Sequence, residues 1–152
     1  MRYVFLIFVA AFTFGNLSAM EGFFVGLGTE INANAPRGPG VSASFIFGAD
    51  LNPHWAVGAK AAYNPNVYVS GTLEPSLLAR YYLTSGSNGP FAQAELGCVI
   101  IFAVDNDYLG FSGGVVTGWR FDLSKSVYLE PALRFGYPYL MGLGVMAGFR
   151  QK

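Results

Sequence analysis

The sequence is poor in the side chains from which catalytic and metal sites are most often built, because it holds one cysteine, Cys98, and one histidine, His54. A single cysteine excludes a disulfide within the chain, and one histidine with one cysteine cannot complete a zinc site. No serine or carboxylate motif accompanies His54 beyond Asp50, so we expect a solvated turn residue and not a general base. We expect Cys98 to be an apolar filler. The sequence therefore predicts a non-enzymatic protein without catalytic residues, metal or cofactor.

Charge is also scarce, since charged residues make up only 12% of the chain. The formal net charge is zero, so no field of one sign favours nucleic acid as a partner. Long apolar runs are missing beyond the N-terminal region: the longest, Leu96 to Val104, is far shorter than the about 20 residues of a transmembrane helix. The chain offers instead 16% aromatic residues and 20 glycines. This composition favours β-structure, because aromatic side chains suit a pleated surface.

The N-terminal region has the features of a secretory signal peptide. Arg2 supplies a positive charge, residues 3–14 are almost wholly apolar, and Leu17-Ser18-Ala19 ends in a small residue suited to signal peptidase. The apolar stretch is too short for a membrane anchor, which needs about 20 residues. The expected cleavage site has no cysteine, so we do not expect a lipoprotein. We therefore predict that residues 1–19 are removed and that residues 20–152 form the mature domain.

After Ala19, apolar residues alternate with small or polar residues in eight runs, with the period of two that is typical of a β-strand. Turn-forming residues such as Asn52-Pro53 separate the runs. Runs of about 9–11 residues suit tilted membrane-crossing strands, and an even number of strands lets both ends of the sheet meet. The expected strands cover residues 22–32, 41–50, 55–63, 72–83, 91–103, 110–121, 127–136 and 140–150.

The two faces of these strands differ in composition, which predicts the face that points outward. One face carries mostly Leu, Val, Ala, Phe, Tyr and Trp, and the other carries Gly, Ser and charges of both signs. The interior of an eight-stranded barrel is only just wide enough for side chains, so the small and charged set suits the interior and the bulky set suits lipid. A soluble barrel of the lipocalin type also alternates and is the alternative. The predicted fold class is all-β, an eight-stranded antiparallel up-and-down transmembrane β-barrel after a cleaved signal peptide.

Two prolines conflict with regular strands. Pro75 and Pro131 lie inside the fourth and seventh expected strands, where each removes a hydrogen-bond donor from the ladder. Either these strands begin later than expected, or each contains a bulge. The prolines belong to similar segments, Leu73 to Leu77 (LEPSL) and Leu129 to Leu133 (LEPAL). We interpret the similarity as two strands with the same packing requirement.

The segment Leu77-Leu78-Ala79-Arg80-Tyr81-Tyr82-Leu83, followed by Gly89-Pro90-Phe91, resembles the strand–turn–strand units of small bacterial outer-membrane barrels. With the signal peptide and the eight alternating runs, residues 20–152 resemble the family typified by the OmpA transmembrane domain and OmpW. The resemblance implies a place in the bacterial outer membrane, contact with its lipids, and insertion by the barrel-assembly machinery. Members commonly end in an aromatic residue that this machinery recognises, whereas here Phe149 is followed by Arg150-Gln151-Lys152.

The inward-facing charges are the candidate functional residues. Unpaired charge is costly in a low-dielectric interior, so we expect these residues to pair. A fully paired set predicts a structural barrel with a largely plugged lumen, and a looser set predicts a narrow porin-like channel for small solutes. The alternative is a barrel that binds or transports a small hydrophobic molecule, either OmpW-like or soluble and lipocalin-like. The expected network consists of Glu30, Lys60, Glu74, Arg80, Glu95, Arg120, Glu130, Arg134 and Arg150, with Asp50 as a further inward charge.

The resemblance also implies how deep these charges lie, because the N-terminus of the resembled barrels is periplasmic. The connections at the opposite, outer mouth are short, which leaves little surface for an adhesin or a receptor. The charges expected on the periplasmic side are Arg80, Glu95, Arg120 and Glu130. The charges expected nearer the outer mouth are Glu30, Lys60, Glu74 and Arg134.

Overall fold

The computed structural model of the protein describes residues 22–34, 38–66, 69–85, 88–102 and 107–151. The expected signal peptide, residues 1–19, lies outside the described residues, so its removal stays a prediction. Within the described ranges, no helix is long and apolar enough to cross a membrane.

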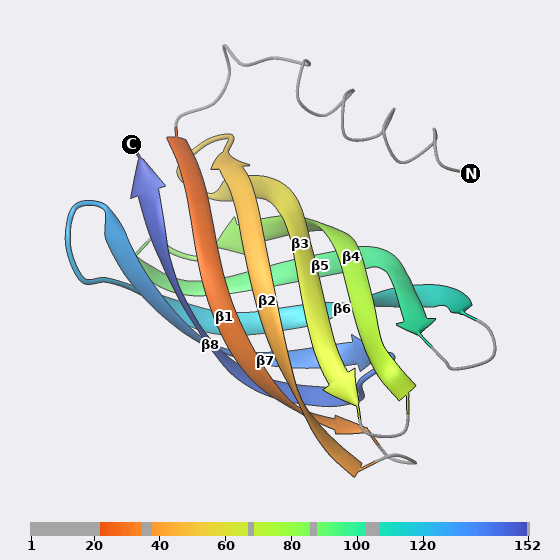
Figure 1. Cartoon of the computed structure of the whole chain (residues 1–152). Helices are drawn as coiled ribbons and strands as arrows, with labels where there is room; N and C mark the ends of the chain where they lie inside the picture. The colour runs from red at the N-terminus through yellow and green to blue at the C-terminus, as the bar shows by residue number, and fades with distance from the viewer. Residues whose placement is uncertain (1–21, 35–37, 67–68, 86–87, 103–106, 152) are drawn as a thin grey trace.

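Eight antiparallel strands form a closed barrel in which each strand pairs with its neighbours in the sequence and β8 pairs with β1 (Figure 1). The predicted eight-stranded all-β barrel is thereby confirmed. Strand β1 begins and strand β8 ends at the same end of the barrel, which is drawn at the top of Figure 1. We call this end the lower end and the opposite end the upper end. The strands are β1 (Gly22–Asn34), β2 (Gly38–Asp50), β3 (Trp55–Asn66), β4 (Val69–Tyr82), β5 (Gly89–Phe102), β6 (Tyr108–Asp122), β7 (Val127–Tyr137) and β8 (Met141–Gln151).

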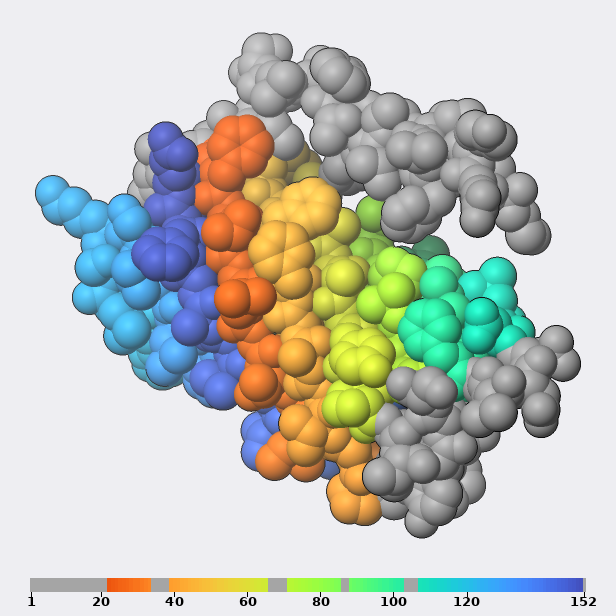
Figure 2. All heavy atoms as spheres, in the orientation of Figure 1, coloured from red at the N-terminus to blue at the C-terminus, as the bar shows by residue number. Residues whose placement is uncertain are grey.

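Alternation along the strands separates the outward from the inward side chains, as expected for a pleated sheet. Leu27 and Leu96 face outward and are 69% and 63% exposed, whereas Phe24 and Ile46 face inward and are 1% exposed. Ala49 is an exception, because it follows the outward alternation of β2 but is buried. On the face seen in Figure 2, the side chains of neighbouring strands β1 to β4 form a continuous outer surface.

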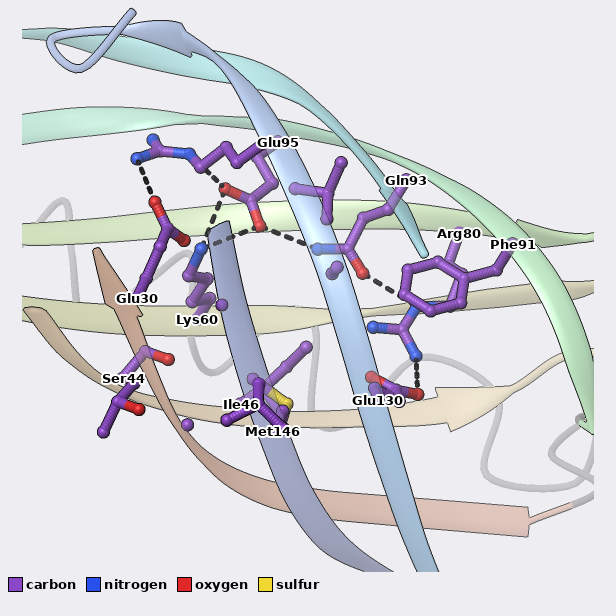
Figure 3. A pocket seen from close by; sticks show the side chains of 17 residues that line it. Glu30, Ser44, Ile46, Lys60, Arg80, Phe91, Gln93, Glu95, Glu130 and Met146 are labelled. Carbon is purple, nitrogen blue, oxygen red and sulfur yellow. Dashed lines mark hydrogen bonds and ion pairs between the residues drawn. The ribbon is translucent and has the colours of Figure 1, made fainter. Parts of the chain in front are cut away.

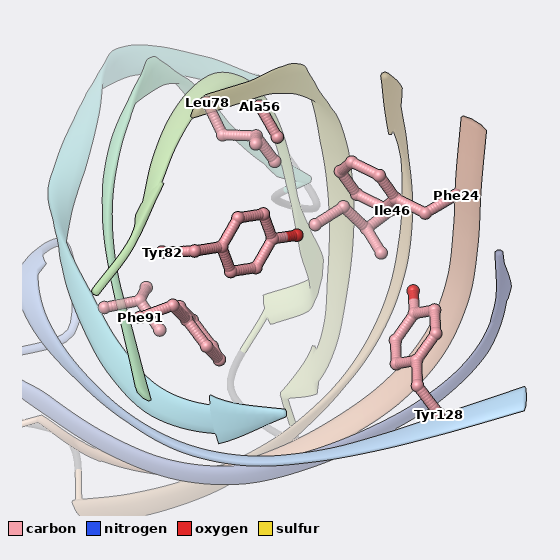
Figure 4. Close-up of a cluster of buried hydrophobic side chains, with 8 residues drawn as sticks. Phe24, Ile46, Ala56, Leu78, Tyr82, Phe91 and Tyr128 are labelled. Carbon is pink, nitrogen blue, oxygen red and sulfur yellow. The ribbon is translucent and has the colours of Figure 1, made fainter. Parts of the chain in front are cut away.

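The core lies inside the barrel and not between layers. Inward-facing apolar side chains from several strands pack together (Figure 4). The aromatic members lie towards the lower end of the barrel, because each stands near the lower end of its strand. An eight-stranded barrel is narrow enough for side chains to fill it. This apolar cluster consists of Phe24, Ile46, Ala56, Leu78, Tyr82, Phe91, Val116 and Tyr128.

Short polar turns close the hairpins at the lower end. Asn52 Oδ1 accepts hydrogen bonds from the backbone N–H groups of His54 at 2.9 Å and Trp55 at 2.8 Å. Ser124 Oγ accepts in the same way from the N–H groups of Ser126 at 3.3 Å and Val127 at 3.1 Å. Such side chains satisfy donors that a tight turn would otherwise leave free, which explains why these residues stand between the strands.

The two prolines lie within full-length strands, so both expectations for them are wrong. Pro75 pairs with β3 on one side, but β4 and β5 skip Glu74 and Pro75 between the pairs Leu73↔Ile100 and Ser76↔Gly97. The register is the same before and after this gap, so the strand neither starts later nor contains a bulge there. The missing proline N–H explains the gap, because the residue cannot donate to the ladder.

Pro131 repeats this arrangement in β7. It pairs with Val145 of β8, while β6 and β7 skip two pairs between Gly118↔Ala132 and Phe121↔Leu129. The similar sequences around the two prolines therefore form similar structures. In each, a glutamate points into the lumen directly before the proline.

Candidate functional site: the charged lumen

Ten charged side chains point into the barrel, where they are buried or nearly so. The structure thus places all nine residues of the expected network inside, together with Asp50. Their formal charges cancel, so the lumen as a whole is neutral when all are ionised. The acidic residues are Glu30, Asp50, Glu74, Glu95 and Glu130, and the basic residues are Lys60, Arg80, Arg120, Arg134 and Arg150.

The lower cluster consists of Arg80, Arg120, Glu130 and Gln93. Arg80 Nη1 donates to Glu130 Oε1 at 2.7 Å, and Arg120 Nε donates to the same oxygen. Arg80 Nε also donates to Gln93 Oε1 at 2.7 Å. One carboxylate therefore serves two guanidinium groups, and the cluster carries a formal charge of +1.

Aromatic rings surround the two guanidinium groups. The Arg80 guanidinium lies 4.2 Å from the ring centre of Phe91, and that of Arg120 lies 4.1 Å from the ring centre of Tyr128. Figure 4 shows both rings among the side chains that point into this part of the lumen. The Nη atoms of Arg120 have no hydrogen-bond acceptor, so the ring faces supply their favourable electrostatic contact.

The upper cluster consists of Glu30, Lys60, Glu74, Glu95 and Arg134. Lys60 Nζ lies 3.1 Å from Glu95 Oε1. Arg134 reaches three carboxylates: Nη2 is 3.1 Å from Glu74 Oε2, Nε is 3.3 Å from Glu95 Oε2, and Nη1 is 4.0 Å from Glu30 Oε1. Glu30 thus has the weakest pairing of the cluster.

Glu95 belongs to this upper cluster, so its expected grouping with the lower charges is wrong. The register explains the difference, because Arg80 of β4 lies opposite Gln93 of β5 and Glu95 lies two residues further up. Gln93 connects the clusters, since its Nε2 donates to Glu95 Oε1 at 2.7 Å while its Oε1 accepts from Arg80 (Figure 3).

A third ion pair lies at the lower end. Arg150 Nε of β8 donates to Asp50 Oδ2 of β2 at 2.8 Å. Strand β1 lies between β8 and β2 in the sheet. The pair therefore joins two strands that are not hydrogen-bonded neighbours.

A small cavity lies between the two clusters. A cavity of about 50 Å³ is lined by members of both clusters, including Glu30, Lys60, Gln93 and Glu130 (Figure 3). A buried water molecule requires about 10–15 Å³ of such volume and several polar partners. The cavity therefore has room for a few water molecules.

The lone histidine holds a turn in place. His54 is half-buried, Nδ1 donates to the backbone oxygen of Tyr82 at 2.9 Å, and its ring stacks on Tyr81 with 5.7 Å between ring centres. It is thus less solvated than expected. Among the residues that the structure describes, no group of three or more His, Cys, Asp or Glu side chains is arranged to hold a metal ion.

Sequence reasoning assigned no role to Gln93 or to the inward aromatic side chains. The signal that could have found them is their position, because Phe24, Tyr82, Phe91 and Tyr128 all follow the inward alternation of their strands. A large inward ring beside inward arginines predicts cation–π contact in so narrow a lumen.

Comparison with known proteins places this geometry in context. No protein-family model and no curated protein matches the sequence. Among solved structures, the N-terminal β-barrel domain of OprF from Pseudomonas aeruginosa matches with a TM-score of 0.69 and 13% identity, over 87% of this chain and 98% of that one. Neisserial surface protein A matches with a TM-score of 0.58 and 17% identity, over 86% and 96% of the two chains.

A designed barrel is similar as well. The solution structure of the de novo protein TMB2.3 matches with a TM-score of 0.54 and 18% identity, over 90% of this chain and 99% of that one. At such identities the likeness establishes the fold. The resemblance expected from the sequence is confirmed at that level: the chain has the fold of the small eight-stranded outer-membrane β-barrels.

Proposed function

We propose that the mature chain is a non-enzymatic integral protein of the bacterial outer membrane, with a structural role and a lumen closed by ion pairs. The observation that carries the proposal is the distribution of charge. Ten charged side chains face inward, while the outward face of the strands is built from exposed residues such as Leu27, Leu96 and Phe149. An apolar outer face is suited to lipid. The closed sheet is suited to it as well, because closure leaves no backbone edge unpaired.

The pairs run across the lumen, which supports a plug more than a channel. Arg80 of β4 contacts Glu130 of β7 at 2.7 Å, and Arg134 of β7 contacts Glu74 of β4 at 3.1 Å. Strands β5 and β6 lie between β4 and β7 in the sheet, so these side chains bridge the interior. A solute would have to displace buried charges that are already paired, which is costly.

The alternative, a barrel for a small hydrophobic molecule, is less well supported. Pockets for such ligands usually measure about 300–1,000 Å³ and are mostly apolar. The interior cavity here is about 50 Å³ and is lined by charged side chains such as Lys60, Glu95 and Arg134. A lipocalin-like role would require these ion pairs to separate.

Fractionation of cells that express the full chain tests the location. We expect the processed protein in the outer-membrane fraction, resistant to extraction by alkaline carbonate, and rich in β-structure by circular dichroism in detergent. A periplasmic protein processed by the same route is the control for export. Recovery of the chain as a soluble periplasmic monomer without detergent would contradict the proposal and favour the soluble barrel.

A further inference from the structure

The upper cluster contains more negative than positive charge. Glu30, Glu74 and Glu95 face Lys60 and Arg134, which leaves a formal charge of −1 when all are ionised. The two basic groups lie within 3.3 Å of Glu74 or Glu95, whereas the nearest basic atom to Glu30 Oε1 is 4.0 Å away. The uncompensated charge is therefore concentrated on Glu30.

Two buried oxygens on β1, one of them on this carboxylate, have no hydrogen-bond partner. They are Glu30 Oε1 and Asn32 Oδ1, and both side chains point inward from β1. Asn32 is 1% exposed, and its Nδ2 donates to Ser42 Oγ at 3.0 Å, which turns Oδ1 away from Ser42. Two acceptors placed together with no donor are unfavourable in a low-dielectric interior.

A glycine makes the room for these two oxygens. Gly142 of β8 lies opposite Asn32, and a Cβ atom at this position would meet both Glu30 Oε1 and Asn32 Oδ1. The oxygens thus converge on a space that any larger residue would fill. Carboxylate and amide oxygens are ligands that hard cations prefer.

We propose that Glu30 and Asn32 form a binding site for one monovalent cation, either a proton or a sodium ion, between Glu30 Oε1 and Asn32 Oδ1. A protonated Glu30 donates a hydrogen bond from its carboxyl group to Asn32 Oδ1, whereas a sodium ion is coordinated by both oxygens. Either occupant brings the upper cluster to neutrality. The charged groups that face Glu30 are Lys60, Glu74, Glu95 and Arg134. The site depends only on the barrel interior and so stands apart from the proposed function.

Thermal unfolding of the refolded mature protein tests the site in two arms. One arm varies pH without sodium, and the other replaces choline chloride by sodium chloride at constant ionic strength and alkaline pH. A bound proton predicts that the wild-type Tm falls relative to Glu30→Gln as pH rises, because proton loss leaves the carboxylate unpaired. A bound sodium ion predicts that the wild-type Tm rises with sodium. Glu30→Gln should follow neither change, since its neutral amide donates to Asn32 Oδ1.

Two further variants and a spectrum keep the result specific. Gly142→Ala retains the carboxylate but displaces it, and should lose the wild-type response; Asp122→Asn removes an exposed carboxylate and should retain it. A proton also predicts an infrared carbonyl band of a protonated carboxylic acid that Glu30→Gln lacks. If wild type and Glu30→Gln respond identically in both arms, the proposal is overturned, and the Asn32 amide lies turned around with Nδ2 donating to Glu30.

Discussion

At the scale of single residues, Glu130 is the side chain on which the lower cluster depends. Its Oε1 accepts from both Arg80 and Arg120, and Glu130 is 2% exposed. Arg120 is itself fully buried. Removal of the carboxylate would leave two guanidinium groups without a counter-charge in a closed interior, where the aromatic rings compensate only in part.

We expect Glu130→Ala to lower the free energy of unfolding by about 3–5 kcal/mol, the usual cost of removing one partner of a buried ion pair. Urea unfolding of the protein refolded in lipid vesicles measures the effect. Asp122→Ala, at the exposed end of β6, is the control and should change stability by no more than about 0.5 kcal/mol. The double variant Glu130→Ala/Arg120→Ala should recover part of the loss, and strict additivity would contradict the pairing.

At the scale of elements, β4 and β7 are linked by exchanged charges. Each carries a glutamate before a proline and an arginine further along, and each arginine contacts the glutamate of the other strand. The strands run in opposite directions, so Glu74 and Arg134 meet in the upper cluster while Arg80 and Glu130 meet in the lower one. The two similar segments therefore have the same structural role, because each supplies the glutamate of an ion pair that links β4 and β7 across the lumen.

The gap beside each proline requires a small residue on the neighbouring strand. Gly118 of β6 pairs with Ala132, and a Cβ atom on it would lie 2.5 Å from the backbone oxygen of Pro131. We expect Gly118→Ala to destabilise the barrel by about 1–3 kcal/mol through overpacking, measured by urea unfolding. Gly110→Ala on the same strand is the control: its Cβ would meet only Val99 Cγ1, at 3.2 Å. Equal stability of both variants would show that the gap tolerates a side chain.

Alternation in the sequence predicted the strands and the inward side chains, but not their depth. Period two determines which face a residue occupies, and so Glu95 was placed inside correctly. Its depth depends on the pairing of β4 with β5, which sets Leu78 opposite Glu95 and Arg80 opposite Gln93. That register is set by the turn between the strands. It therefore cannot be predicted from the pattern of residues within a strand.

The alternation in the sequence also did not predict where the strands begin or how the sheet accommodates the two prolines. Strands β2 and β4 begin at Gly38 and Val69, three residues earlier than expected, because pairing with the previous strand continues through residues that lack alternation. The expected breaks at Pro75 and Pro131 do not occur, since each proline keeps its partner on one side. The sequence shows that each proline lacks a hydrogen-bond donor. It does not show that the residue pairs on either side of the proline keep the strands in register.

At the scale of the whole molecule, the proposed membrane location predicts that the stability effect of a substitution on the apolar outer surface depends on its depth in the lipid. Leu96 lies near the middle of β5 and Leu109 near the upper end of β6, and they are 63% and 60% exposed. We expect Leu96→Arg to cost about 2–4 kcal/mol of unfolding free energy in lipid vesicles, and Leu109→Arg about 0–1 kcal/mol. Similar small effects for both variants would mean that the outer face does not contact lipid.

The lumen and the outer surface together support the proposed closed barrel in a membrane. We expect ion pairs at three levels to oppose the passage of ions through the interior. They are Arg150–Asp50 lowest, then Arg80–Glu130, then Arg134–Glu74. We expect the lower cluster to contribute most to this barrier, because aromatic rings enclose its paired guanidinium groups.

Conductance across a planar lipid bilayer tests this account most directly. The refolded mature chain should leave the bilayer at the level of its protein-free leak, because the lumen is filled with paired charges. Glu130→Ala, which loosens the lower cluster, should raise the current in discrete steps, while Asp122→Ala should behave as the wild type. Sustained wild-type conductance that Glu130→Ala leaves unchanged would contradict the closed lumen and favour a narrow channel.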